Sequence, residues 1–471
     1  MAKYRILWVD DEWADNAENL CNAKTRLLSE LADKRIDVSI KTESTIADAV
    51  VEVSRQDIEY RLVVVDLVFH EQRYEVEPLL GRLYERMIPY IVFTNFIDKL
   101  DDKRFGHNKK NYFVGKFVKS PQGCIDFSKA VALFFSSLPV RILHLSDLHY
   151  DANLSIEVDK EERDALFDSL VDCIENESNI QPFDAVVICG DISMFTPNKD
   201  LIEARSLIKR INTVTVNDLN RLAIIPGNHD ILWDDFDKKK LSEQPMRPYL
   251  EFYHAIYGQH VNILCELSSW NNKYELFDHD STTDKLSWVR NIPSSRLNLI
   301  GLCSINLDPE KQGHGIFSRQ QKKIIEENWH DDNKYNVRIA LMHHNLYAAL
   351  SFNRNSETSV LDNSGEAMYS LMSNGCTCVL SGHTHSVNYV QCKASRLGLD
   401  GFTRLTSFDV ISGGTAGGTH IVRDRPRSFN IINFSHIKAD TMKRTMTISP
   451  FLYDSDEHKW KEKRPLECEG G

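Results

Sequence analysis

The sequence predicts an α/β protein with two domains, and three observations lead to this prediction. The chain has 471 residues, whereas one domain typically contains about 100–200 residues. Short, unbroken apolar runs alternate with amphipathic stretches, a pattern typical of buried parallel strands joined by helices. The pattern breaks near Pro139 and then starts again. The hydrophobic and charged fractions, 42% and 26%, are those of a globular protein, so we expect both domains to pack a core.

The first domain is expected over residues 1–138. Apolar, β-branched runs at residues 4–9, 62–65 and 90–93 predict buried strands. Helices are expected between them, at residues 16–31, and after the last strand, at residues 125–135. The residues from Ser136 to Pro139 end this series. This order of elements predicts a parallel sheet covered by helices.

The second domain is expected over residues 139–455. Further buried strands are predicted at residues 141–145, 185–189, 222–225, 297–302, 337–342 and 377–380. Apolar positions at helical spacing predict a helix over residues 161–177. Residues 456–471 are polar and charged, and we expect them to form a loosely held tail.

Composition limits the classes of function. No run approaches the roughly 20 apolar residues of a membrane span, and the N-terminal residues lack a signal-peptide pattern, so we expect a cytoplasmic protein that does not enter a membrane. The ten cysteines are scattered and are expected to be reduced thiols. The formal net charge of −12 makes nucleic acid a less favoured substrate.

Polar clusters follow five of the predicted strands in the second domain. In open α/β sheets, ligands bind beyond the carboxyl ends of the strands, so these clusters should meet. They are Ser146-Asp147-Leu148-His149, Gly190-Asp191, Gly227-Asn228-His229-Asp230, Met342-His343-His344-Asn345 and Gly382-His383-Thr384-His385.

This inventory matches the requirements of a site for two divalent cations about 3.5–4 Å apart. Asp191 can bridge the two ions, and the imidazoles, Asp147 and the Asn228 amide can supply terminal ligands. Taken singly, these residues are better explained as loop caps, as core histidines or, for Asn228 and His229, as a turn. Five clusters in register with five strand ends favour the metal site.

The motifs DLH, GD, GNHD, MHH and GHTH resemble the pattern of the calcineurin-like metallophosphoesterases. The resemblance implies an α/β sandwich with two metal ions (Mn, Fe, Zn or Ni) bridged by Asp191 and a hydroxide. One ion would be held by Asp147, His149, Asp191 and His385, and the other by Asp191, Asn228, His343 and His383. His344 is the alternative to His343, which we prefer because it directly follows the apolar strand.

The same resemblance implies a mechanism. A hydroxide bound to the two ions would attack the phosphorus atom in line with the leaving group. His229 would donate a proton to the leaving oxygen, and Asp230 would orient His229.

A second ordered set of polar residues follows the strands of the first domain: Asp10, Asp11, Asp66, Thr94 and Lys119. This set resembles a response-regulator receiver, which implies a flavodoxin-like parallel sheet. Asp10, Asp11 and Asp66 would hold Mg²⁺, and Asp66 would accept a phosphoryl group contacted by Thr94 and Lys119. A histidine kinase or phosphotransfer protein would then be a partner.

The match to receivers has two departures. Ser120 stands where receivers usually have proline, and residues 67–72 lack the usual Met-Pro. The alternative is a receiver-like scaffold that no longer accepts a phosphoryl group.

These features predict a metal-dependent phosphoesterase that hydrolyses a nucleotide or another small phosphodiester and is regulated by receiver phosphorylation. One alternative is a DNA or RNA nuclease, with the basic residues 423–427 holding the backbone. Another is a non-catalytic phosphorelay interaction protein. Gly413, Gly414, Gly417 and Gly418 are expected to form a flexible loop near the substrate. The sequence is compatible with a homo-oligomer.

Overall fold

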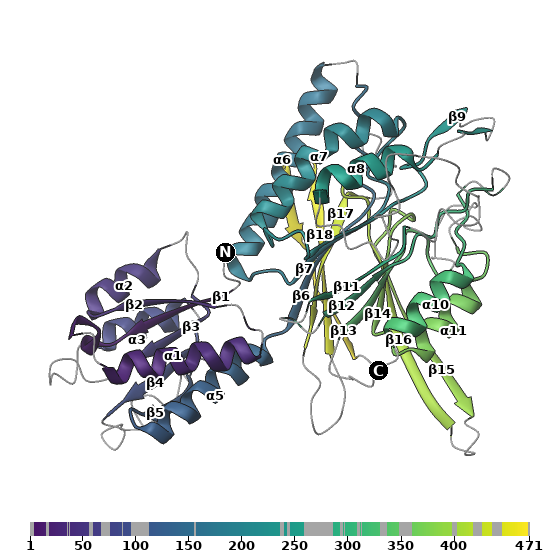
Figure 1. The fold of residues 1–471 in the computed structure, drawn as a ribbon. Coiled ribbons are helices and arrows are strands. Elements are labelled where there is room, and N and C mark those ends of the chain that lie inside the picture. Colours follow the sequence, from purple (N-terminus) through teal and green to yellow (C-terminus); the bar gives the residue numbers. More distant parts are fainter. Residues whose placement is uncertain are drawn as a thin grey trace. The chain divides into compact units, whose positions relative to one another are not determined.

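The computed structural model of the chain describes residues 4–15, 18–34, 36, 38–55, 60–66, 76–86, 88–95, 113–154, 157–235, 240–242, 245–258, 286–292, 295, 297–308, 311, 313–329, 337–347, 360–397, 403–417, 426–435 and 445–469. The chain forms two compact units (Figure 1). The N-terminal unit contains residues 1–138 with 179–182, and the C-terminal unit contains residues 139–178 and 183–471. Among the described residues, no helix has both the length and the apolar character that crossing a membrane requires.

The N-terminal unit is a five-stranded parallel sheet with strand order β2-β1-β3-β4-β5. This is the flavodoxin-like order, and it confirms the predicted fold class. The strands are β1 (Tyr4–Val9), β2 (Val38–Glu43), β3 (Leu62–Val65), β4 (Tyr90–Thr94) and β5 (Phe113–Val118). The helices are η1 (Asp11–Asp15), α1 (Glu18–Asp33), α2 (Ile46–Ser54), α3 (Glu77–Glu85) and α5 (Pro121–Ser137).

Both faces of this sheet are buried, which explains why its central strands are apolar throughout. Ile6 and Trp8 point to the face covered by α1 and α5. Leu7 and Val9 point to the opposite face, covered by α2 and α3. The alternation of side chains along β1 therefore supplies two cores from one strand.

The C-terminal unit contains two facing sheets. The first has the order β19-β18-β17-β6-β7-β8, with β20 paired to β18, and the second has the order β11-β12-β13-β14-β16-β15. Strands of the first sheet are β6 (Val140–Leu145), β7 (Ala185–Cys189), β8 (Leu222–Ile225), β17 (Ser428–Phe434), β18 (Thr445–Asp454), β19 (Lys459–Glu462) and β20 (Leu466–Glu469). Strands of the second are β11 (Trp288–Ile292), β12 (Leu297–Gly301), β13 (Val337–Leu341), β14 (Cys378–Ser381), β15 (Asn388–Leu397) and β16 (Thr403–Ser412). A small hairpin, β9 (Trp233–Asp235) with β10 (Lys240–Leu241), lies outside both sheets.

Three hydrophobic clusters stack these elements into layers. The middle cluster joins the two sheets, with Val187 of β7 and Ile339 of β13 among its members. The outer face of the first sheet packs against α6 (Glu157–Ile180), α7 (Pro197–Val214) and α8 (Arg247–Tyr257). The outer face of the second packs against α10 (Arg319–Asn328) and α11 (Ser364–Ser373). The predicted α/β sandwich is confirmed.

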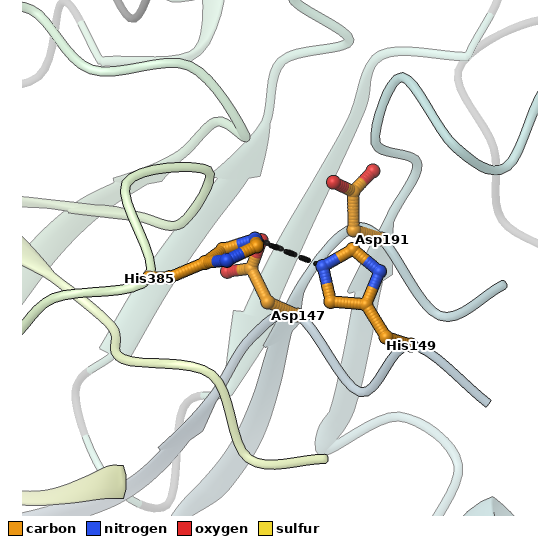
Figure 2. A group of neighbouring side chains, drawn as sticks. All are labelled: Asp147, His149, Asp191 and His385. Carbon is orange, nitrogen blue, oxygen red and sulfur yellow. Dashed lines mark hydrogen bonds and ion pairs between the residues drawn. The ribbon is translucent and has the colours of Figure 1, made fainter. Parts of the chain in front are cut away.

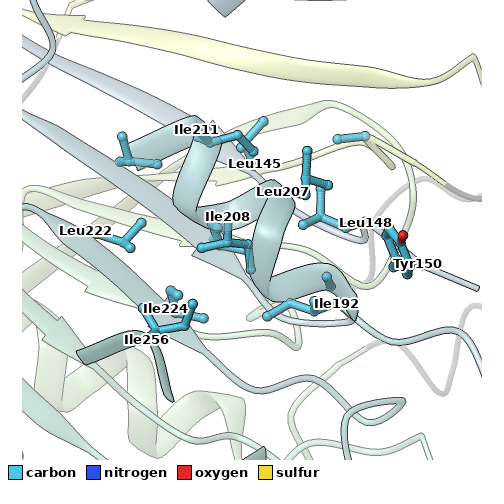
Figure 3. Packing of buried hydrophobic residues seen from close by; sticks show 14 of the residues in the cluster. Leu145, Leu148, Tyr150, Ile192, Leu207, Ile208, Ile211, Leu222, Ile224 and Ile256 are labelled. Carbon is cyan, nitrogen blue, oxygen red and sulfur yellow. The ribbon is translucent and has the colours of Figure 1, made fainter. Parts of the chain in front are cut away.

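Helix α7 shows how the first of these layers is fixed. Leu207, Ile208 and Ile211 recur at helical spacing and are buried against the first sheet (Figure 3). The same cluster includes Leu148 and Ile192, which lie in the loops that leave β6 and β7. The hydrophobic core therefore extends directly beneath the loops at the carboxyl ends of these strands.

The C-terminal residues correct one expectation. Residues 459–462 and 466–469 are not loosely held, because they form β19 and β20, which both pair with β18; residues 470 and 471 lie outside the described part of the chain. Trp460 is 8% exposed and packs against the rings of Phe429 and Tyr453. The charged side chains described there are exposed or partly exposed, while Trp460 in β19 and Cys468 in β20 are buried.

Candidate functional site

The loops that leave β6, β7, β8, β13 and β14 at their carboxyl ends bring the seven predicted ligands together. These strands are parallel within their sheets, so the loops of each sheet emerge at one edge. The residues are Asp147 and His149 after β6, Asp191 after β7, Asn228 after β8, His343 after β13, and His383 and His385 after β14. Residues 236 positions apart thus become neighbours.

The first group consists of Asp147, His149, Asp191 and His385, whose ligand atoms lie within 4.8 Å of one another. Figure 2 shows the rings of His149 and His385 meeting beside Asp147. The two Nε2 atoms are 2.9 Å apart, and His385 Nε2 is 3.3 Å from Asp147 Oδ1.

The second group consists of Asp191, His343 and His383, again within 4.8 Å. His343 Nε2 lies 3.2 Å from Asp191 Oδ2, 3.2 Å from His383 Nδ1 and 3.1 Å from Asn228 Oδ1. Asp191 belongs to both groups, as expected of a bridging ligand.

The donor atoms around His343 fit a bound cation. His343 Nδ1 lies 2.7 Å from the carbonyl oxygen of Cys189, which can only accept, so Nδ1 carries a proton. The Nε2 atom of a neutral ring then presents a lone pair toward oxygen atoms of Asp191 and Asn228. Lone pairs that face one another repel unless a metal ion or a proton lies between them, and in the metal-free protein a proton on Nε2 takes this place. A ring whose other nitrogen donates to a backbone carbonyl is the usual arrangement of a metal-ligating histidine.

Electrostatics also indicate a site that attracts positive charge. Burial disfavours a charged His343, but Asp191 and Asp147 outweigh it and raise the pKa of the imidazole to about 9. Burial lowers the pKa of His149 to about 3 and that of His383 to about 4. These two rings are therefore neutral at physiological pH, the form in which imidazole binds metals.

Five of the seven predicted ligands adopt backbone conformations that are unfavourable for residues other than glycine. The φ angles of Asp147, His149, Asp191, His383 and His385 lie between 43° and 68°. Such left-handed residues cost on the order of 1–3 kcal/mol each and persist only where the surroundings hold them. Hydrogen bonds from Asp147 N to Gly190 O and from His149 N to Asp191 O provide part of that support.

The described part of the glycine-rich segment after β16 is buried and hydrogen-bonded to the site, where we had expected a flexible loop. Gly413, Gly414 and Gly417 are buried, and Gly418 lies outside the described residues. The Thr415 hydroxyl donates to Asp147 O at 2.8 Å, and Ala416 N donates to Ser146 O at 3.0 Å. A Cβ atom on Gly417 would collide with the carbonyl of Leu148. The glycines are needed because this segment packs directly against the backbone of the site.

His229 lies next to the first group, with its ring centroid 5.2 Å from that of His149. Its backbone N–H donates to Asp191 Oδ1 at 2.8 Å, and its Nδ1 lies 2.7 Å from the carbonyl oxygen of Met194. Met194 thus orients the ring, a contact that the sequence did not suggest.

Asp230 has a different position from the one expected. Its two carboxylate oxygens accept hydrogen bonds from the backbone N–H groups of Ser193 and Gly227, each at 2.8 Å. It therefore fixes the loop backbone, where we had expected it to orient His229. Burial, with a contribution from Asp191, raises the pKa of Asp230 to about 7.

Two neighbours of His343 help to hold the site. His344 turns away from the ligand groups, and its Nδ1 lies 2.9 Å from the Ser304 hydroxyl. Asn345 is buried, and its side-chain oxygen accepts hydrogen bonds from the hydroxyls of Ser381 and Ser412. Asn345 therefore ties together the ends of β13, β14 and β16. Its position beside two histidines was the only sequence signal for this role.

The N-terminal unit holds a separate acidic group, Asp10, Asp11 and Asp66, with carboxylate oxygens within 4.8 Å of one another. Lys119 Nζ lies 2.6 Å from Asp66 Oδ2 and 2.9 Å from Asp10 Oδ2. Burial is the main cause that raises the pKa of Asp10 to about 7; Lys119 opposes the shift and Asp66 adds to it. Thr94 is buried at the end of β4, and its carbonyl accepts a hydrogen bond from Lys119 N. The residues that follow Asp66, 67–75, lie outside the described part of the chain.

Comparisons with known proteins bear mainly on the C-terminal unit. The sequence model of the calcineurin-like phosphoesterases matches residues 140–387, and no curated protein matches the chain. The N-terminal part is similar to a response regulator receiver domain protein from Methanospirillum hungatei, with 19% identity, a TM-score of 0.21, and coverage of 28% of this chain and 94% of that one. A receiver domain protein from Clostridium thermocellum gives 19% identity, a TM-score of 0.21, and coverage of 27% and 90%.

Proposed function

This chain belongs to the calcineurin-like phosphoesterase family, whose sequence model matches just over half of it, and is a metal-dependent phosphoester hydrolase; we propose that it hydrolyses a nucleotide or another small phosphodiester. The observation that carries this proposal is the convergence of seven ligand side chains on two adjoining positions that share Asp191. The non-catalytic alternative would be favoured by a missing ligand, so the convergence of all seven residues supports the catalytic one instead.

We assign Asp147, His149, Asp191 and His385 to one divalent cation, and Asp191, Asn228, His343 and His383 to the other. Divalent cations held by these residues would lower the pKa of a bound water molecule and neutralise charge on the phosphoryl oxygens. The mixed nitrogen and oxygen donors suit Mn, Fe, Zn or Ni.

His229 supplies the proton that the leaving oxygen needs. Because its Nδ1 lies against the Met194 carbonyl, Nδ1 carries a proton in either charge state. The transferable proton of the imidazolium is then on Nε2, and loss of that proton leaves a neutral ring that Met194 still orients.

Replacement of His229 by alanine tests this role. We expect a loss of about 100-fold or more in kcat/KM on a diester with an alkoxide leaving group, since general acids contribute roughly this much. Bis-p-nitrophenyl phosphate should be affected far less, because p-nitrophenolate leaves without protonation. Equal losses on the two substrates would remove His229 from the acid role.

The acidic balance of the chain, −12 at neutral pH, supports a small substrate over a nucleic acid. The basic stretch proposed for backbone binding gives little support to the nuclease alternative. Residues 423–425 lie outside the described residues, and the guanidinium of Arg427 lies over the ring of Tyr453, 5.7 Å from its centroid. A screen of nucleotide diesters, glycerophosphodiesters and single-stranded oligonucleotides would distinguish the substrate classes.

We further propose that phosphorylation of Asp66 regulates the esterase. A carboxylate oxygen of Asp66 would attack the phosphorus atom of a phosphohistidine donor or of acetyl phosphate, and imidazole or acetate would leave. The contact between Lys119 Nζ and Asp66 supports this assignment, since the ammonium can also bind the added phosphoryl group. Mg²⁺ held by Asp10, Asp11 and Asp66 would screen the carboxylates from the incoming phosphate. A histidine kinase or phosphotransfer protein would be the donor.

A further inference from the structure

Asp200, in the first turn of α7, has an unusual number of hydrogen-bond donors. Its side chain is fully buried, and its two carboxylate oxygens accept from four backbone N–H groups and two hydroxyls. The backbone donors are Ala152 at 2.9 Å, Met194 at 3.2 Å, Phe195 at 3.1 Å and Thr196 at 2.8 Å. The hydroxyl donors are Ser193 and Thr196, each at 2.9 Å.

These donors come from two loops of the site. Ala152 lies in the loop after β6 that carries Asp147 and His149, and residues 193–196 follow Asp191 in the loop after β7. Capping of α7 explains only the contact with Thr196, the residue at the helix N-cap. The contacts with Ala152 and Met194 join the two loops to each other and do not stabilise the helix.

Met194 connects this network to His229. The carbonyl oxygen of Met194 lies against His229 Nδ1, and its N–H is held by Asp200 and by the carbonyl of Tyr150 at 3.1 Å. A shift of this residue would turn the imidazole relative to the leaving group. A misplacement of about 1 Å in a catalytic group can cost roughly 100-fold in rate.

We propose that Asp200 is a positioning residue for His229, acting through the backbone of residues 193–196. The inference rests on the proposed acid role of His229. An aspartate side chain presents two oxygen atoms, and both of them accept hydrogen bonds here. An asparagine at this position would turn an NH₂ group toward backbone donors, and the loop would have to move.

The test is a double-mutant cycle of Asp200→Asn with His229→Ala, in Mn²⁺, on diphenyl phosphate and bis-p-nitrophenyl phosphate. We expect Asp200→Asn alone to lower kcat/KM about tenfold on diphenyl phosphate, whose leaving group is poorer, and much less on the activated ester. In the His229→Ala background, Asp200→Asn should add little further loss, because the group that it positions is already absent.

Asp184→Asn is the matched control. Asp184 is also buried, accepts from Arg141 N at 2.9 Å and from the Ser295 hydroxyl, and precedes β7 at the end of the strand away from the site. The Asp184→Asn variant should have a lower unfolding temperature but an unchanged ratio of activity on diphenyl phosphate to activity on bis-p-nitrophenyl phosphate. If Asp200→Asn does not fold, Ser193→Ala removes one donor to Asp200 and should give a smaller loss with the same substrate dependence.

Equal losses on the two esters, or losses that add fully to those of His229→Ala, would overturn the positioning role. Failure of the acid role itself has a separate signature, since His229→Ala would then affect both esters alike. In that case the cycle still decides the inference, because only a coupled pair gives non-additive losses.

Discussion

The two candidate metal sites of this protein occupy equivalent places in their folds and are built differently. Both lie beyond the carboxyl ends of parallel strands. The C-terminal site combines two carboxylates, an amide and four imidazoles from five loops. The N-terminal site contains three carboxylates and the ammonium group of Lys119.

The backbones of the two sites differ as well. Five ligand residues of the C-terminal site have positive φ, whereas within the described part of the N-terminal unit every non-glycine residue has a negative φ. The C-terminal site therefore has a fixed geometry whose strain is carried by the surrounding loops. Its donors suit tightly held transition metals, while an all-oxygen site that already contains a lysine suits weakly bound, exchangeable Mg²⁺.

The largest expected effect is on hydrolysis, and one substitution in each site should have contrasting results. Asp191→Asn should lower metal-dependent hydrolysis of bis-p-nitrophenyl phosphate by about 1000-fold or more, because both cations lose their shared ligand. Asp66→Asn should leave the unstimulated hydrolysis intact. A large loss of basal hydrolysis in Asp66→Asn would contradict a regulatory role of Asp66 that depends on its phosphorylation.

Gly417→Ala tests whether the fixed geometry of the C-terminal site depends on the glycine-rich segment. The added Cβ must displace the Leu148 carbonyl, between Asp147 and His149. We expect a destabilisation of about 1–3 kcal/mol and at least a tenfold loss of kcat/KM. Gly365→Ala in α11 is the control, since its Cβ meets no atom within 4 Å. Wild-type activity in Gly417→Ala would restore the flexible-loop interpretation.

Beryllofluoride with Mg²⁺ tests whether the N-terminal site binds a phosphoryl group. Binding to Asp66 is expected to change the fluorescence of Trp13, which lies in η1 beside Asp11 and contacts Trp8 at a ring-centroid distance of 5.5 Å. Acetyl phosphate should add one phosphoryl group, detected by mass spectrometry. The absence of both changes, with Asp66→Asn as the reference, would favour a receiver-like scaffold that is not phosphorylated.

The last prediction concerns stability alone, through the charge at Asp10 in the metal-free protein. Folding raises the pKa of Asp10 from 3.8 to about 7. Between pH 4 and pH 7 the folded state therefore keeps a proton on Asp10 that the unfolded state has lost. The free energy of unfolding falls as the pH rises through this range. Asp10→Asn should therefore raise the free energy of unfolding at pH 8 in EDTA, by up to about 4 kcal/mol, and have little effect at pH 4. An equal gain in the free energy of unfolding at pH 8 and pH 4 would show that the charge of Asp10 is not its cause.

The strands that were predicted from the sequence have one feature in common. The strands recognised in the sequence, such as β3, β7 and β13, are buried on both faces and therefore appear as unbroken apolar runs. β2 and β15 are edge strands with mixed polar and apolar residues, and their pairing depends on neighbours distant in the chain. The strands β16–β20 were missed as well.

The sequence by itself determined which residues form the candidate metal site, because each of them lies in the loop that follows a strand whose apolar run marks its end. Only the tertiary structure decided which of His343 and His344 faces the ligand groups, that Met194 orients His229, and that Asp230 and Asp200 hold the loops. These contacts involve backbone atoms of loops that follow different strands. Every residue except proline has the same backbone N–H and carbonyl groups, so the sequence does not show which of them will form such a contact. Their positions follow from how the strands are stacked, which local patterns do not encode.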